Sequence, residues 1–354
     1  MNYFSFVLLG LFSLSLLGCS GERSSENTTA ADTTAQAAGE VNVYTHRHYE
    51  SDQELFRRFE QQTGIKVNVV SASADELIQR LQMEGQNSPA DVLITVDGGR
   101  LWRAKSQGLL SPVQSKVLTD NIPAPFRDKE GQWFGLTYRA RILAYDSTRI
   151  RPGQLATYAD LANPRFKGQI LVRSSDNLYN QSLLASIIAH EGSEAALRWA
   201  KGVVANMARQ PKGNDRDQVK TVTSGQGSIA IVNSYYIGNM LASEDAAEAE
   251  AGRKVKVFFP NQEGRGTHIN VSGGGVTRHA PNRQNAIKFL EYLSSDEAQQ
   301  VFAQANYEYP VKEGVAWSPT LQKWGRFKAD TLDLEALGRY NAEAVTIFDK
   351  AGWK

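Results

Sequence analysis

Tyrosine and histidine side chains follow three apolar runs of the chain, and each run has the composition of a β-strand. They are His48 and Tyr49 after VNVY (41–44), Tyr179 after GQILVR (168–173), and Tyr235 and Tyr236 after GSIAIVN (227–233). Ligands of open α/β sheets bind at the carboxyl ends of strands, so these side chains are candidates for one site. Alone, each tyrosine would be interpreted as a packing residue, but their common position favours a shared function.

The adjacent pair Tyr235 and Tyr236 sets a condition on the local backbone. Successive residues of a strand point to opposite faces of the sheet. The two rings can therefore converge only at a turn or at the start of a helix, where Asn233 or Ser234 would be the N-cap.

The chemistry of this set of side chains suits a hard trivalent cation. A phenolate is a hard anionic oxygen donor, as in tyrosine-ligated haem. The pKa of a free tyrosine is about 10, so a strong Lewis acid such as Fe³⁺ is needed to deprotonate it at neutral pH. Zn²⁺ favours Cys, His and carboxylate ligands, and Ca²⁺ favours carboxylates and carbonyls. The residue types therefore favour ferric iron over these two cations.

Charge balance adds cations to the expected site. Phenolates from all four tyrosines around one Fe³⁺ leave one negative charge in excess, and a neutral imidazole does not change that total. Arg47, Arg139 and Arg141 lie in the right segments to offset this charge. Each could equally be an ordinary ion-paired arginine, and the sequence does not choose among the three.

Alternating strands and helices are expected to position these residues. Strands are expected at 41–44, 65–70 and 90–96, within 135–146, and at 168–174, 227–234 and 254–260. Helices are expected from a capping box of Ser51 and Glu54 to Gly64, from a capping box of Ser73 and Glu76 through Met83, around 183–189, and over 285–306 as one or two helices. The alternation at the start of the body predicts right-handed crossovers and a parallel sheet. The glycines at 273–275 indicate a turn or a close backbone approach.

Composition places the chain among soluble globular proteins and argues against several functions. Its 354 residues exceed the size at which a single core keeps growing, so two lobes are expected. A formal net charge of +1 gives no support to a nucleic-acid partner. The sequence has no GxGxxG or GxxxxGK[ST] phosphate loop and no G-x-S-x-G nucleophile motif, and its single cysteine is at position 19. His268 and His279 are isolated, so an enzyme is not expected.

The N-terminal segment has the features of an export signal. Residues 1–18 carry no charge and lead into LLGC, which resembles a bacterial lipoprotein signal with Cys19 as the lipidated first mature residue. A plain secretory signal is the alternative. Residues 19–39 are rich in Ser, Thr and Ala and are predicted to form a disordered tether. The expected location is periplasmic, with a lipid anchor in a bacterial membrane.

Four stretches of the body resemble the ferric-iron-binding proteins of bacterial ABC importers. They are VYTHRHYESDQELFRRFEQQTGIKV, SPADVLITVDGGRLW, YRARILAYDS and GSIAIVNSYYIGNML. The resemblance covers the chain from about Val41 to near the C-terminus, and its HRHY and NxYY motifs are more specific than its fold pattern. It implies an α/β, two-lobed periplasmic binding protein fold (type II, transferrin-like), with a hinge of crossing strands and a cleft between the lobes. The implied lobes are 40–137 plus 268–311 (N-terminal) and 138–267 plus 312–354 (C-terminal).

The resemblance also implies a set of metal ligands. The tyrosine-rich branch of the family matches here at His48, Tyr49, Tyr179, Tyr235 and Tyr236, with His46 as the alternative to His48. Another branch uses a glutamate after the third strand and an exogenous anion held by a Ser/Gly turn. This chain has Val96 at the glutamate position, and its turn reads RSSDN. Five protein ligands and little need for a bound anion are therefore expected.

The implied function is the extracytoplasmic binding of Fe³⁺ as a transported ligand and its delivery to an ABC permease and ATPase by a monomer. Ligands from both lobes would draw the lobes together around the metal. Protonation of the phenolates or reduction of the iron would release it. The alternatives are a same-fold binder of a small organic or anionic ligand, a transferase on the same scaffold, and a redox or signalling role for iron.

Overall fold

The computed structural model describes residues 39–47, 49–151 and 153–354. The predicted signal, Cys19 and nearly all of the predicted tether lie outside the described residues, and so does His48. No described helix combines the length and the apolar character that crossing a membrane requires.

The described residues form strands and helices that alternate along much of the chain. The strands are β1 Glu40–Thr45, β2 Lys66–Ser71, β3 Val92–Thr95, β4 Phe134–Tyr145, β5 Ile170–Leu171, β6 Ile229–Asn233, β7 Lys256–Phe258, β8 Ile269–Val276 and β9 Tyr309–Pro310. The α-helices are α1 Glu50–Thr63, α2 Ala74–Glu84, α3 Gly98–Ser106, α4 Lys116–Asn121, α5 Leu178–Glu191, α6 Ser193–Asn206, α7 Asp215–Thr223, α8 Ser234–Leu241, α9 Ala246–Lys254, α10 Arg283–Leu293, α11 Asp296–Ala305, α12 Pro319–Trp324, α13 Glu335–Arg339 and α14 Asn341–Ala351.

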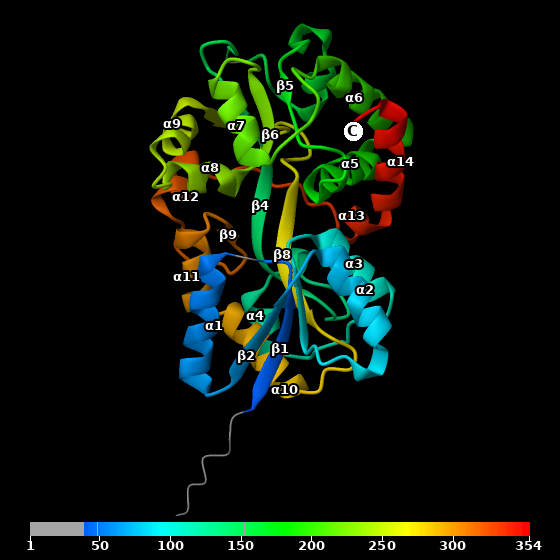
Figure 1. The fold of residues 1–354 in the computed structure, drawn as a ribbon, viewed down its shortest axis with the longest axis vertical. Helices are drawn as coiled ribbons and strands as arrows, with labels where there is room; N and C mark the ends of the chain where they lie inside the picture. The colour runs from blue at the N-terminus through cyan, green and yellow to red at the C-terminus, as the bar shows by residue number, and fades with distance from the viewer. Residues whose placement is uncertain (1–38, 48, 152) are drawn as a thin grey trace, which may run out of the picture. The chain divides into compact units, whose positions relative to one another are not determined.

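The strands are hydrogen-bonded in the order β2-β1-β3-β8-β4-β6-β5, and β7 and β9 also pair with β4. β1 is parallel to β2 and β3, which confirms the parallel start of the sheet. The long strand β4 joins two halves of the sheet, because its first part pairs with β8 and its last part pairs with β6 and β7. We call the part around β1, β2 and β3 the N-terminal lobe and the part around β5, β6 and β7 the C-terminal lobe, and β4 and β8 run between them (Figure 1).

Each lobe has its own hydrophobic core. Val41, Val92 and Phe289 are fully buried in a core of the N-terminal lobe. Leu184 and Ile229 are fully buried in a core of the C-terminal lobe. The two-lobed α/β architecture is therefore confirmed, while the residue bounds of the lobes stay a prediction.

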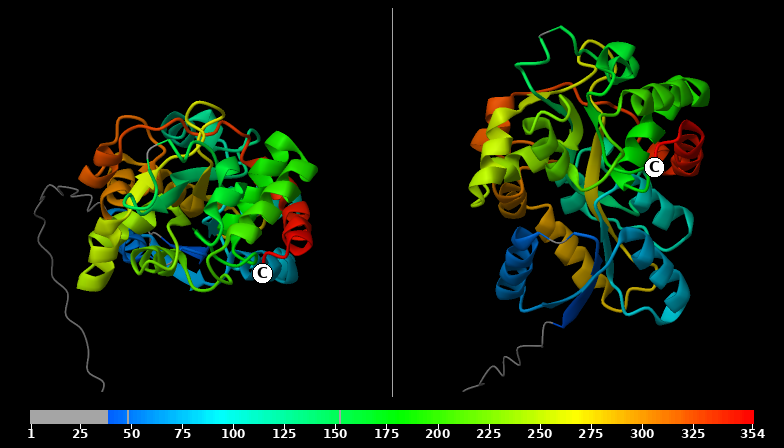
Figure 2. Two further views of the ribbon diagram at one scale, coloured as in Figure 1. Left: turned by 90° about the horizontal axis from the view of Figure 1, so that it is seen from above. Right: turned by 45° about the horizontal axis from the view of Figure 1, so that its top comes forward.

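The C-terminal segment packs against both lobes. Leu334 and Leu337, at α13, belong to a core of the N-terminal lobe together with Leu101. Ile347 and Phe348, on α14, belong to the core of the C-terminal lobe. Figure 2 shows α14 in red beside the green helices of the C-terminal lobe, and α14 contacts α5 and α6.

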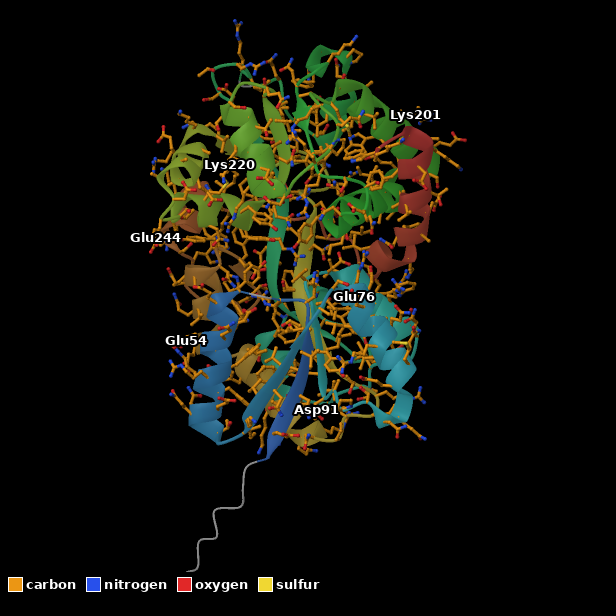
Figure 3. All side chains as sticks on the ribbon, viewed as in Figure 1. Glu54, Glu76, Asp91, Lys201, Lys220 and Glu244 are labelled. Carbon is orange, nitrogen blue, oxygen red and sulfur yellow. The ribbon has the colours of Figure 1, made fainter. Side chains whose placement is uncertain are left out.

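Charged side chains lie on the outer surfaces of both lobes. Glu76, Lys201 and Glu244 are examples, and all three are exposed (Figure 3).

Of the two capping boxes that the sequence predicts, one is present in the structure and the other is not. The capping box of Ser73 and Glu76 is confirmed, with both reciprocal hydrogen bonds present. The capping box of Ser51 and Glu54 is wrong, because α1 begins at Glu50 with Tyr49 as its N-cap. The Ser51 hydroxyl instead donates to Asn306 Oδ1 at 2.8 Å.

The glycines at 273–275 mark a close backbone approach, as predicted. A Cβ at Gly275 would lie 2.3 Å from the Gln132 carbonyl oxygen, and one at Gly273 would lie 2.5 Å from the Phe134 carbonyl oxygen. Larger side chains at either position would force β8 away from its neighbour, so these glycines keep the crossing strands in register.

Candidate functional site

A cavity of about 930 Å³ has walls from both lobes. The N-terminal lobe contributes the segment around the start of α1 and the end of α11, and the C-terminal lobe contributes the starts of α5, α7 and α8. Tyr49, Tyr179, Tyr235 and Tyr236 all line this cavity. The structure thus brings the four predicted tyrosines together from three distant parts of the sequence.

The four phenols form one cluster. The hydroxyl oxygens of Tyr179 and Tyr235 lie 3.2 Å apart and share a hydrogen bond. The rings of Tyr235 and Tyr236 have centroids 4.2 Å apart, and the ring of Tyr49 stands edge-on to Tyr235 with centroids 6.1 Å apart. The cluster therefore presents several phenol oxygens to the same cavity.

Each tyrosine lies at the start of a helix. Tyr49 is the N-cap of α1, and Tyr179 is the second residue of α5. Tyr235 and Tyr236 follow Ser234 in the first turn of α8, whose N-cap is Asn233. The prediction that the Tyr pair converges at a helix start is confirmed. Helix N-termini carry partial positive charge, which favours anionic oxygens there.

The N-cap residue Asn233 does not cap through its side chain. Its Oδ1 instead accepts a hydrogen bond from Arg141 Nη1 at 3.1 Å, and its backbone N–H donates to Asp215 Oδ2 at 2.8 Å. The end of β6 is therefore fixed by buried polar contacts, and this fixes where α8 and its two tyrosines begin.

Burial raises the pKa of three phenols of the cluster. It raises the pKa of Tyr49 well above 10.0, and the nearby Glu308 carboxylate adds to the rise. Burial also raises the pKa of Tyr235 and of Tyr236, and the nearby Tyr179 adds to the rise in both cases. At neutral pH without a bound cation these three phenols are therefore neutral.

Arg47 is neutralised by carboxylates. It is buried, with Nη2 at 2.9 Å from Asp52 Oδ1 and Nη1 at 3.0 Å from Glu308 Oε2. Its guanidinium also lies 4.8 Å from the centroid of the Tyr49 ring. Arg47 therefore holds the Tyr49 ring in place, while two carboxylates offset its charge.

Arg141 is paired with a carboxylate, whereas Arg139 is not paired with one among the described residues. Arg141 is paired with Asp215, at 2.8 Å between Nη1 and Oδ2. Arg139 is 1% exposed, and Nη1 of its guanidinium donates to Ser272 Oγ at 3.3 Å; no carboxylate pairs with it among the described residues. Its guanidinium lies 5.5 Å from the centroid of the Tyr179 ring. Arg139 is the predicted cation whose charge the described part of the chain leaves uncompensated.

Of the two histidines of the HRHY motif, the structure describes His46. His46 lines the cavity, and its backbone N–H donates to the Ile94 carbonyl at 2.9 Å. His48 lies outside the described residues. Across the positions that are described, no group of three or more His, Cys, Asp or Glu side chains could hold a metal ion.

The sequence analysis missed polar residues that also line the cavity. Arg173 is the last residue of the run GQILVR and could have been found by its place at a strand end. The other missed residues lie at helix ends. Asn177 is the N-cap of α5, Asn214 is the N-cap of α7, and Asn306 follows the last residue of α11. Nothing in their local sequence separates them from ordinary capping residues, so no signal predicted their place in the cavity.

Comparison with known proteins agrees with this architecture. Residues 87–333 match the family described as bacterial extracellular solute-binding protein. Iron uptake protein A1 of Synechocystis is 50% identical over 330 residues, which cover 93% of this chain and 91% of that protein. The Fe(3+)-binding periplasmic protein of Serratia marcescens is 26% identical over 323 residues, covering 90% and 93% of the two chains.

Solved structures give the same result. A Trichodesmium protein in complex with iron and citrate ligands superposes with a TM-score of 0.85 at 49% identity, covering 89% of this chain and all (100%) of that one. The ferric binding protein from Campylobacter jejuni superposes with a TM-score of 0.86 at 45% identity, with the same coverage of 89% and 100%. The predicted periplasmic binding protein fold and the resemblance to ferric-iron-binding proteins are confirmed. The chain belongs to the family of bacterial extracellular solute-binding proteins.

Proposed function

We propose that this chain binds ferric iron outside the cytoplasm and delivers it to the permease and ATPase of an ABC importer. The observation that carries the proposal is the convergence of Tyr49, Tyr179, Tyr235 and Tyr236 on one interlobe cavity. Phenol oxygens become strong ligands only for a cation acidic enough to displace their protons, and Fe³⁺ is such a cation. Iron-binding relatives that cover nearly the whole chain support this assignment.

The ligands of the proposed site are Tyr49, Tyr179, Tyr235 and Tyr236, with a histidine from the HRHY motif. Once deprotonated, the four phenolates and Fe³⁺ carry one excess negative charge. Arg139 offsets it, because it is buried near Tyr179 and no described carboxylate neutralises it. The N-termini of α1, α5 and α8 add favourable partial charge.

The proposed site is divided between the lobes. Tyr49 belongs to the N-terminal lobe, and the other three tyrosines belong to the C-terminal lobe. A cation that binds both sets stabilises the arrangement in which they face each other, so it shifts the population toward a closed cleft. The permease would then distinguish the loaded from the empty protein by the orientation of its lobes.

Replacement of one proposed ligand tests the assignment. Tyr235→Phe removes one hydroxyl and keeps the ring that packs on Tyr236. Mutation of a residue that hydrogen-bonds to a metal ligand costs about 10–100-fold in metal affinity. Loss of a ligand itself should therefore lower ferric affinity by more than about 100-fold. Equilibrium titration with ferric citrate measures this effect, and urea unfolding should show that the variant remains folded.

Tyr292→Phe is the matched control. Tyr292 is on α10, away from the cavity, and its buried hydroxyl has no hydrogen-bond partner among the described residues, so the same chemical change should leave ferric affinity unchanged. If Tyr235→Phe binds ferric iron as tightly as the wild type, the assignment of Tyr235 as a ligand is contradicted.

We also propose that Cys19 carries a lipid that anchors the protein to a bacterial membrane, as a monomer. The LLGC motif and the uncharged run before it support this proposal. A single acyl chain binds a membrane only marginally, so stable anchoring needs the several chains of a lipoprotein. Cys19→Ser should release the protein from the detergent-extracted membrane fraction into the soluble fraction, and continued membrane association would contradict the anchor.

A further inference from the structure

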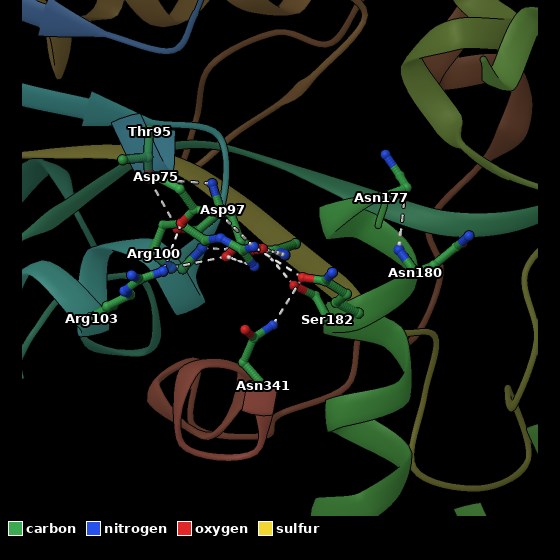
Figure 4. Close-up of polar contacts among 12 residues, drawn as sticks. Asp75, Thr95, Asp97, Arg100, Arg103, Asn177, Asn180, Ser182 and Asn341 are labelled. Atoms are coloured by element: carbon green, nitrogen blue, oxygen red, sulfur yellow. Dashed lines mark hydrogen bonds and ion pairs between the residues drawn. The ribbon is translucent and has the colours of Figure 1, made fainter. Parts of the chain in front are cut away.

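Two buried polar contacts join the lobes beside the crossing strands. Asp97, at the end of β3, accepts a hydrogen bond from the Ser182 hydroxyl on α5 at 2.5 Å. Arg100, on α3, donates from Nη2 to the Gln181 side-chain oxygen at 3.0 Å. We call Asp97, Arg100, Gln181 and Ser182 the interlobe latch, and Figure 4 labels Asp97, Arg100 and Ser182 among its polar contacts. All four residues are buried, with Asp97 at 0% exposure and Gln181 at 7%.

The N-terminal side of the latch is held rigidly. The carboxylate of Asp97 also accepts from Asn270 Nδ2 at 2.7 Å and from the backbone N–H of Arg100 at 2.9 Å. The guanidinium of Arg100 is further fixed by Asp75, at 3.2 Å between Nη2 and Oδ2. The guanidinium of Arg100 is therefore held in position by the N-terminal lobe where it contacts Gln181.

Gln181 connects this cation to the wall of the cavity. Its side-chain oxygen accepts from Arg100 and, at 3.2 Å, from Asn341 Nδ2, while its side-chain N–H groups donate to the Ser175 and Asp176 carbonyls at 3.1 and 3.3 Å. Those carbonyls belong to the loop 173–177, which leads into the start of α5. One amide thus contacts the opposite lobe with one atom and the loop before Tyr179 with the other.

The loop 173–177 sets the position of Tyr179. Arg173, Asn177 and Tyr179 all line the cavity, and Tyr179 lies two residues before Gln181 on α5. Asn180 holds the other end of the loop, with Nδ2 donating to the Arg173 and Ser174 carbonyls at 2.9 and 3.1 Å. Within the loop the Asn177 backbone N–H donates to the Ser174 carbonyl at 3.2 Å, and the side-chain amides of Asn180 and Gln181 hold the carbonyls of residues 173–176.

We infer that Arg100 and Gln181 are positioning residues for the metal site, which tie the loop before Tyr179 to the opposite lobe so that the placement of Tyr179 depends on lobe orientation. This inference rests on the proposed function and adds to it. Neither side chain lines the cavity, so neither is proposed to touch the metal. A hydrogen bond to a buried charged group is among the stronger ones, which suits a contact that must persist as the lobes move.

Two variants and a control test the inference in the full chain. Arg100→Gln removes the cation that reaches Gln181, and Gln181→Met removes both ends of the amide while nearly keeping its volume. Each should lower ferric affinity by about tenfold, because the loop must then be ordered when the metal binds. The double variant should lose little more than either single variant, since both break the same connection.

Arg103→Gln is the matched control. Arg103 is also on α3 and also pairs with Asp75, at 2.9 Å, but it has no contact with Gln181 and its side chain is 44% exposed. The affinity of the Arg103→Gln variant for ferric iron should equal that of the wild type. Urea unfolding of the iron-free proteins separates positioning from stability, because a merely structural role would lower the free energy of unfolding and leave the affinity of the folded protein unchanged.

The outcomes are distinct. A wild type that does not bind ferric iron would overturn the proposed function, and the inference with it. A wild type that binds, together with Arg100→Gln and Gln181→Met variants of wild-type affinity, would overturn the inference alone. If Arg100→Gln does not fold, Gln181→Met still decides, because it leaves the ion pairs of Arg100 in place.

Discussion

At the scale of single residues, Tyr49, Tyr235 and Tyr236 are neutral while the cleft is empty. Burial raises the pKa of Tyr49, Tyr235 and Tyr236 above the ordinary value of 10.0, so an empty cleft avoids the cost of several buried anions. A cation must therefore displace protons to bind. This requirement disfavours weakly acidic cations at the site.

The raised pKa values predict proton release on binding. The three phenols are protonated at neutral pH, so forming tyrosinates from them must release about one proton per tyrosinate ligand. Ferric affinity should therefore rise with pH and fall on acidification. Calorimetric titration in buffers of different ionisation enthalpy measures the number of protons released.

Tyr236→Phe provides the check on that number. At saturating iron it should release about one proton fewer than the wild type, and Tyr292→Phe should match the wild type. Equal proton release by all three proteins would contradict tyrosinate ligation at Tyr236.

At the scale of elements, the site is positioned by the ends of helices and by what holds the preceding loops. The last buried tryptophan of the chain, Trp353, donates from its indole N–H to the Arg173 carbonyl at 3.0 Å. Its ring packs on Phe348 and Trp199, with centroids 4.9 and 6.0 Å away. The C-terminal tail thus fixes the first residue of the loop 173–177.

Trp353→Phe should weaken iron binding without unfolding the protein. It removes the hydrogen bond to the loop and keeps most of the ring packing, so ferric affinity should fall several-fold and the free energy of unfolding by about 1–2 kcal/mol. Ferric titration and urea unfolding measure the two effects.

Trp199→Phe is the control for this change. Trp199 lies in the same cluster, and its indole N–H donates to the Tyr158 carbonyl at 2.7 Å, away from the cavity. Trp199→Phe should lower the free energy of unfolding by a similar amount and leave ferric affinity unchanged. Equal affinity in Trp353→Phe and Trp199→Phe would show that the tail does not position the loop.

The elements also show what local sequence can predict. The capping box of Ser73 and Glu76 depends on residues three apart, and it was predictable for that reason. At Ser51 the same local pattern is overridden, because Asn306, more than two hundred residues later, accepts the hydroxyl hydrogen. The helix start under Tyr235 and Tyr236 could be predicted, but the buried contacts of Asn233 that fix it could not.

At the scale of the whole molecule, the sequence predicts two lobes and the four tyrosines that face each other between them. The partners of the arginines could not be predicted, because Glu308 and Asp215 lie far from Arg47 and Arg141 in sequence. The division of the C-terminal segment, with α13 in one core and α14 in another, likewise depends on tertiary packing. These long-range contacts make the segment a link between the lobes.

The visible absorption spectrum of residues 39–354, titrated with ferric citrate, tests the central claim most directly. Charge transfer from tyrosinate to Fe³⁺ should produce a new broad visible band that saturates at about one iron per chain, as expected for a phenolate-ligated ferric centre. Absence of the band, with no change in thermal stability on adding iron, would mean that the tyrosines of the cleft are packing residues. A small organic or anionic ligand would then be the better account of the cavity.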